Sequence, residues 1–96
     1  MLIRSQNKEV LAVFENLLDV EVSGGVINAK KDNGWYCLLG EYSTKAKAMK
    51  VLDMIQEAYS EYQIMLNFSV SYLHEFKEKT DGFAIFQMPE DSEVEA

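Results

Sequence analysis

The stretch LGEYSTKAKAMKVLDMIQEAY, residues 39–59, decides the fold class, because it joins the end of a strand to a capped amphipathic helix. Ser43 is placed as the N-cap, whose hydroxyl accepts from a free amide of the first turn, and Thr44 could do the same one residue later. Apolar residues then recur at helical spacing from about residue 44 to 62. They are Ala48, Val51, Leu52, Ile55, Tyr59 and Tyr62. One apolar stripe predicts a helix that lies on a sheet.

Three short segments before this stretch supply strands for that sheet. Residues 2–5 (LIRS) and 9–14 (EVLAVF) are rich in apolar and β-branched residues. Residues 19–23 (DVEVS) alternate charge with valine, which indicates an edge strand or one half of a bulged strand. Gly24-Gly25 then ends it.

A β-hairpin is the strongest strand signal. Residues 26–40 (VINAKKDNGWYCLLG) are two apolar runs around a polar turn, and Asn33-Gly34 accepts the positive φ angles of a type I′ turn. Successive side chains of a strand point to opposite faces. The second strand is therefore expected to carry Trp35, Cys37 and Leu39 on one side and Tyr36 and Leu38 on the other.

The rest of the chain, from residue 63 onward, has a less clear secondary-structure pattern. Residues 63–80 fit both a strand and a helix, and we favour a helix over 69–79 with a break near Asn67. Residues 83–88 (FAIFQM) predict a strand that stops at Pro89. The predicted fold is α+β: an antiparallel sheet of four or five strands with one main helix packed on one face. It forms a single domain over 1–89, followed by a flexible acidic tail over 90–96.

Composition narrows the functional classes. A chain of 96 residues with a net charge of −7 is the size of one domain and lacks the basic surface that nucleic-acid binding requires. Its start has no signal-peptide pattern and no apolar run is long enough to span a bilayer. With Cys37 as its one cysteine, no internal disulfide framework exists, so a cytoplasmic protein without membrane contact is expected.

Three pieces of the sequence carry a family resemblance. IRSQ at 3–6, LGEYSTKAKAMKVLDMIQEAY at 39–59 and FQMPEDSEVE at 86–95 occur in this order. Together they resemble a group of small uncharacterised proteins encoded by phages and prophages of Gram-positive bacteria. Members of that group often have a glutamate three residues after the helix cap, where this chain has Ala46. The resemblance implies a phage or mobile-element context, without an activity or catalytic residues.

The residues that could carry chemistry are few. Cys37 and His74 are the one thiol and the one imidazole, too few for a usual zinc site, and a Cys–His catalytic pair is a minor alternative to a structural thiol. Glu75 and Glu78 are three apart but lie among lysines, as on an ordinary solvated face. We therefore expect no enzyme activity, no metal and no cofactor.

Binding to another protein is the function that the sequence favours. Aromatic side chains with a polar tip are enriched at interfaces, and an acidic segment suits a basic partner. The candidate interface residues are Trp35, Tyr42, Tyr62, Tyr72, His74, Glu90, Asp91 and Glu93. The expected function is a phage-type accessory protein that binds a protein partner, which includes self-association as a dimer through an exposed strand edge. The alternative is an acidic inhibitor of a nucleic-acid-binding host defence protein, comparable to anti-CRISPR proteins.

Overall fold

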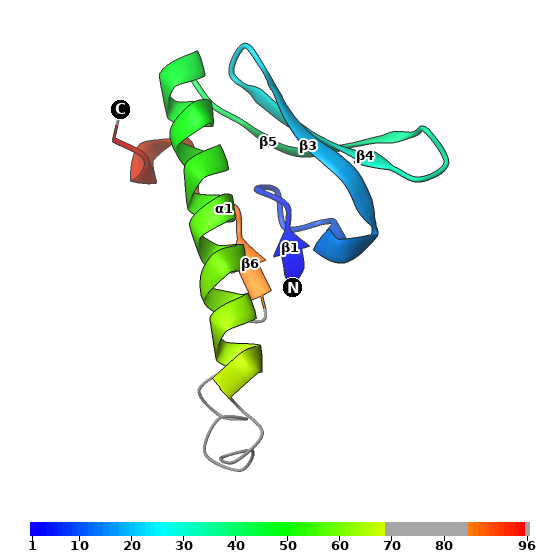
Figure 1. The fold of residues 1–96 in the computed structure, drawn as a ribbon. Coiled ribbons are helices and arrows are strands. Elements are labelled where there is room, and N and C mark those ends of the chain that lie inside the picture. Colours follow the sequence, from blue (N-terminus) through cyan, green and yellow to red (C-terminus); the bar gives the residue numbers. More distant parts are fainter. Residues whose placement is uncertain (69–84, 96) are drawn as a thin grey trace.

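The structure, a computed structural model, describes residues 1–68 and 85–95. Over these residues the chain forms two three-stranded sheets and one long helix (Figure 1). The α+β class is confirmed. The expectation of a single sheet of four or five strands is corrected, because the short 3₁₀ turn η1 (Phe14–Asn16) redirects the chain between the first two strands and the next three.

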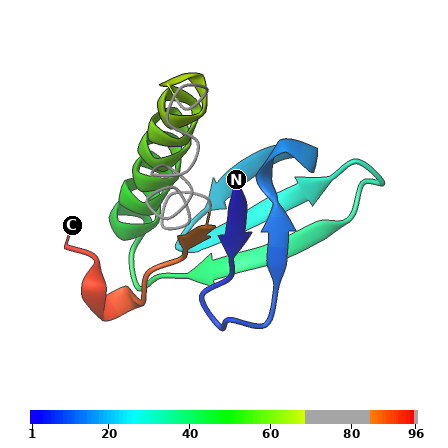
Figure 2. The same cartoon turned by 90° about the horizontal axis from the view of Figure 1, so that it is seen from below.

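The first sheet pairs segments that are far apart in the sequence. Strand β1 (Leu2–Arg4) lies between β2 (Leu11–Val13), which is antiparallel to it, and β6 (Ile85–Gln87), which is parallel to it. Figure 2 shows β1 and β6 side by side below the helix. The strands predicted over 2–5, 9–14 and 83–88 are thus present, in shortened form; residues 83–84 lie outside the described residues.

The second sheet is an antiparallel meander of β3 (Leu17–Ser23), β4 (Val26–Lys31) and β5 (Tyr36–Glu41), with β4 in the centre. The prediction of an edge strand over 19–23 is confirmed, because β3 pairs with β4 alone among the described strands. The alternative of a bulged strand is confirmed as well, since the pairing register shifts between Leu17 and Asp19.

The β4–β5 hairpin is confirmed, but its turn is of another type. The Gly34 amide donates to the Lys31 carbonyl at 3.0 Å, and Gly34 has φ of +85°. Asn33 has no positive φ, although a type I′ turn requires one at both central residues. The loop therefore matches a type I turn closed by a left-handed glycine, and Trp35 belongs to the loop instead of the strand.

Helix α1 (Lys45–Phe68) begins one residue later and ends later than predicted. The Lys47 amide donates to Thr44 Oγ1 at 3.1 Å, so Thr44 is the N-cap and Ser43 is not. The Ser43 amide donates instead to Asp91 Oδ1 at 2.7 Å. The helix also continues through Asn67, where a break was expected, and the helix expected over 69–79 lies outside the described residues.

The predicted apolar stripe of α1 builds the core. Ala48, Val51 and Ile55 are buried, and the other three residues of the stripe are partly buried. Both sheets contribute to the same core, which also contains Ile3 and Ile27. The helix thus closes over two small sheets, and neither sheet has to cover it alone.

The three segments that carry the family resemblance meet where the two sheets and the start of α1 join. We call this place the junction and define it by Gln6, Tyr42, Pro89 and Asp91. The Gln6 side chain exchanges two hydrogen bonds with the backbone of Glu41, at 2.9 and 3.0 Å. It thereby continues the edge of β5 as an added strand would, and its Nε2 also donates to the Pro89 carbonyl at 3.3 Å.

Tyr42 binds the other side of the junction. Its hydroxyl donates to the Pro89 carbonyl at 2.8 Å, and its backbone amide donates to the Gly25 carbonyl at 2.7 Å. A Cβ at Gly25 would collide with the Tyr42 carbonyl oxygen, so this position requires glycine. The Gly24-Gly25 pair therefore serves the turn and this close approach together.

The acidic segment after Pro89 is packed on the domain, which differs from the expected flexible tail. Residues Asp91–Glu93 form the 3₁₀ turn η3, with a capping box between Glu90 and Glu93. Val94 is only 5% exposed and belongs to the core. Figures 1 and 2 place this segment beside the first turns of α1. Residue 96 lies outside the described residues.

Candidate protein-binding surfaces

The tip of the β4–β5 hairpin carries the largest exposed aromatic side chain. We call Trp35, Tyr36 and Leu38 the hairpin surface; they are 72%, 55% and 44% exposed. Tyr36 and Leu38 alternate with the buried Cys37 and Leu39, as predicted for β5. Trp35 was expected in the strand, on the same side as Cys37, but it lies in the loop ahead of the strand and is exposed.

One cation lies close to the hairpin surface. The ammonium of Lys30 sits 5.9 Å from the centre of the Tyr36 ring, within the range of a cation–π contact. Lys30 and Tyr36 are also direct cross-strand partners. The contact lies on the exposed face of β5, which also carries Leu38.

Tyr42 is not a surface anchor, contrary to expectation. It is 7% exposed and its hydroxyl is bonded to Pro89. Burial, together with the negative charges of Glu90, Asp91 and Glu93, raises the pKa of Tyr42 to about 12. Its ring and hydroxyl are committed to the fold.

Two of the three predicted acidic contacts remain on the surface. Glu90 and Glu93 are exposed, whereas Asp91 faces the start of α1. There the Ser43 amide, helped by the Lys47 ammonium, holds the pKa of Asp91 below its ordinary value. Asp91 thus supplies a negative charge to a helix whose first turn contains no acid of its own.

Tyr62 lies on the inner side of α1 and is partly buried. Its ring is 6.1 Å from that of Tyr59, which in turn lies 4.6 Å from the ring of Phe14. The Gln63 amide donates to the Tyr59 hydroxyl at 2.7 Å. This aromatic row holds η1 against the helix, so packing is the observed role of Tyr62.

The remaining candidates are only partly placed. Tyr72, His74, Glu75 and Glu78 lie outside the described residues, so the Cys37–His74 alternative stays a prediction. Cys37 itself is buried and unpaired with another cysteine. Within residues 1–68 and 85–95 no group of three His, Cys, Asp or Glu side chains could hold a metal ion. None of the helices in those ranges combines the length and the apolar character needed to cross a membrane.

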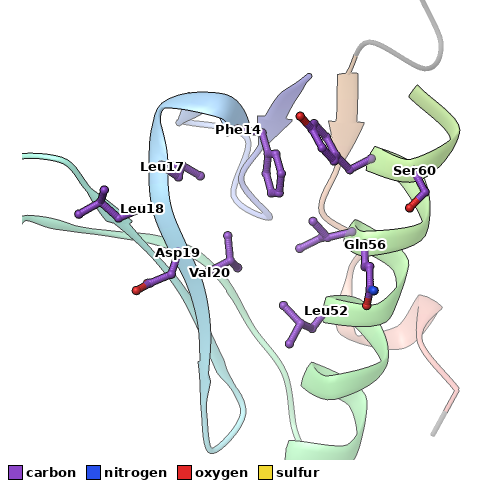
Figure 3. Close-up of a pocket in the computed structure, with 10 residues that line it drawn as sticks. Phe14, Leu17, Leu18, Asp19, Val20, Leu52, Gln56 and Ser60 are labelled. Carbon is purple, nitrogen blue, oxygen red and sulfur yellow. The ribbon is translucent and has the colours of Figure 1, made fainter. Parts of the chain in front are cut away.

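A groove that the sequence did not reveal lies between β3 and α1. It has a volume of about 490 Å³ and we call it the β3–α1 groove. One wall is formed by Phe14, Leu17 and Val20, and the other by Leu52, Ile55 and Tyr59. In Figure 3, Phe14 and Val20 point toward the helix and Leu52 points back toward β3, while Leu18 and Asp19 point away.

The groove follows from two features of the sequence, each visible only in part. Valines alternate with acids in β3, so the valine face turns inward, and Leu52 belongs to the apolar stripe of α1 but is only partly buried. The sequence does not show that the edge of β3 lies opposite Leu52.

Comparisons with other proteins do not assign the chain. A scan against protein-family models found no matching family, and searches of curated proteins and of solved structures found no match. The resemblance to small phage proteins therefore stays a prediction.

Proposed function

We propose that this chain is a non-catalytic protein-binding domain, and that it is a phage-type accessory protein of the bacterial cytoplasm. The observation that supports this proposal is the hairpin surface. Tryptophan is the residue most often found at the energetic centre of an interface, and Trp35 is 72% exposed at the end of a projecting hairpin. Exposed apolar groups that are contiguous mark binding sites more reliably than scattered ones.

Intrinsic fluorescence tests the proposal directly, because Trp35 is the one tryptophan of the chain. A partner that covers the hairpin surface moves Trp35 from water to an apolar environment, and its emission then shifts to shorter wavelength. Dilution of the protein alone tests self-association in the same way. An emission maximum that is unchanged over a wide concentration range would contradict a dimer formed through the hairpin surface.

A matched pair of variants identifies the surface. Proteins are captured from a Gram-positive host lysate with the native chain, with Trp35→Ala and with Met49→Ala. Met49 is 42% exposed and belongs to α1, not to the hairpin. The proposal expects that Trp35→Ala loses the captured protein and that Met49→Ala keeps it. Equal capture by both variants would contradict binding through the hairpin surface.

The acidic-inhibitor alternative has weaker support. A mimic of nucleic acid needs contiguous unpaired carboxylates, but Asp91 is bound to Ser43 and Lys47. Salt separates the two proposals. Binding by mimicry should fall steeply between low and half-molar salt and be competed by the target's nucleic acid, whereas binding centred on Trp35 should change little.

A further inference from the structure

We propose that the β3–α1 groove binds an extended segment of another protein, which adds to β3 as a fourth strand. Its apolar side chains would point toward α1, and its alternate side chains would be lysine or arginine. This site is separate from the hairpin surface, so it goes beyond the proposed function. Three observations support it: the open edge of β3, the apolar walls of the groove and the charge on the outer face of β3.

The backbone edge of β3 is open. In an antiparallel pair the N–H and C=O groups of every other residue point away from the partner strand. Strand β3 spans Leu17–Ser23 and, in the part of the chain that the structure describes, pairs with β4 alone. Beyond this pairing, the only backbone bond that a β3 residue makes within residues 1–68 and 85–95 is local, from the Leu17 amide to the Phe14 carbonyl. Such an edge binds extended peptides through main-chain hydrogen bonds.

The groove beside that edge provides for side chains. Its volume of about 490 Å³ falls within the usual range for ligand sites, and the walls described above are apolar. An added strand places alternate side chains on the inner face, where Val20 and Leu52 face each other across the groove (Figure 3). A peptide with apolar residues at alternate positions therefore fits.

The charges on the opposite face of β3 select the partner. Asp19 and Glu21 are exposed there, and within the part of the chain that the structure describes neither forms an ion pair. If two copies of β3 paired antiparallel around Val20, Asp19 of each copy would lie opposite Glu21 of the other. Like charges directly opposite are destabilising, whereas opposite charges stabilise a strand pair. The edge thus favours a basic strand over a second copy of this chain.

The test uses a fluorescein-labelled octapeptide of alternating lysine and valine, with capped ends, and measures anisotropy against the native chain. Two peptides serve as controls: one of alternating glutamate and valine, and one with four lysines followed by four valines. We expect binding of the first peptide alone. Equal binding of the block peptide would overturn the proposal, because that peptide has the same composition without the alternation.

N-methylation of the probe tests the main-chain contacts. Methylating one alternate set of peptide amides should abolish binding, and methylating the other set should leave it intact, because only one set faces β3. Equal affinity for both methylated peptides would overturn strand addition and assign the groove to side-chain contacts or to a small apolar ligand.

Protein variants locate the site. Gln56→Trp places a large ring at the groove mouth, while Glu57→Trp places the same ring at an exposed neighbour that does not line it. We expect that Gln56→Trp abolishes binding and that Glu57→Trp does not. The double variant Asp19→Asn, Glu21→Gln should weaken binding by about three- to tenfold, as expected for two cross-strand charge pairs.

Two results would contradict the location or the occupant. Unchanged peptide binding by Gln56→Trp would show that the peptide binds elsewhere. A dimer of the native chain that dissociates in Gln56→Trp, measured by sedimentation, would assign the groove to a second copy.

Discussion

The two edges of the β3–β4–β5 sheet differ in whether another described segment hydrogen-bonds to their backbone. At β5 the Gln6 side chain bonds to both backbone groups of Glu41. The backbone amide of Gln6 also donates to the Leu39 carbonyl at 2.7 Å. At β3 no described residue does the same, and the edge borders an apolar groove. An edge that is closed by the chain itself contributes stability, whereas an open edge next to a groove is available to a partner. The comparison separates the part of the molecule that holds the fold from the part that can bind.

The largest expected effect contrasts the core with the groove wall. Ile55 is 2% exposed, so Ile55→Ala should lower the free energy of unfolding by about 2–5 kcal/mol. Leu52 is only partly buried, so Leu52→Ala should cost about 1 kcal/mol. Chemical denaturation measures both. Equal losses would mean that Leu52 is packed as tightly as the core, and that no groove is open beside it.

The second prediction concerns the stability of the fold at alkaline pH, through Tyr42 at the junction. The pKa of Tyr42 is about 12 in the folded chain and near 10 when unfolded, so the folded state holds the proton more tightly. The contribution of Tyr42 to stability is therefore constant below pH 10 and falls as pH rises toward 12, by at most about 3 kcal/mol for two pKa units. Unfolding curves at successive pH values measure this loss. Tyr42→Phe should remove this part of the alkaline loss, and a variant with the native pH profile would refute the assignment.

Variants of two glutamines compare the stability contributed at the edge of β5 with that contributed at the groove beside β3. Gln6→Ala removes the hydrogen bonds that close β5 and should cost about 1–3 kcal/mol of stability. Gln56→Ala changes an exposed side chain at the groove mouth and should change stability by less than about 0.5 kcal/mol. Thermal unfolding compares the two. If both variants were equally stable, Gln6 would not be closing the edge of β5.

The smallest predicted change in stability occurs at acidic pH and concerns Asp91. Since its bond to the Ser43 amide lowers the pKa of Asp91, this carboxylate stabilises the fold above its unfolded pKa, and the contribution is lost as pH falls through the folded pKa. Asp91→Ala should therefore melt below the native chain at neutral pH and match it at strongly acidic pH. A gap that stayed constant with pH would show that packing of η3, and not the charge, is responsible.

The sequence predicted the features that depend on neighbouring residues. The helical stripe, the β4–β5 hairpin and the edge position of β3 all follow from local periodicity. The errors concern long-range partners. The burial of Tyr42 depends on Pro89, which is 47 residues away, and the packing of the acidic segment depends on the start of α1. The turn type was misread because the register, which places Gly34 after the turn, is fixed by the pairing of Lys30 with Tyr36.

The candidate binding surfaces show the same division between features that follow from local patterns and features that depend on long-range contacts. Trp35 was predicted as an interface residue from its aromatic side chain and is exposed, although it lies in the loop and not in the strand where it was expected. The β3–α1 groove could not be found, since it depends on the distance between two elements that no local pattern encodes. Gln6 was quoted within a motif, but nothing in the motif indicates that its amide would continue a strand.

The parallel pairing of β1 with β6 has a consequence for how the chain acquires its fold. Leu2 pairs with Ile85, a separation of 83 residues (85 minus 2), so this contact closes a loop that includes nearly the whole chain. Contacts of such sequence separation slow folding, because the entropy of closure is lost before any pairing compensates for it. During synthesis the meander and α1 can assemble as soon as they leave the ribosome, while the sheet of β1 and β2 still lacks β6. The helix start would then lack its acidic cap until Asp91 is made, and the junction would form after the meander and α1.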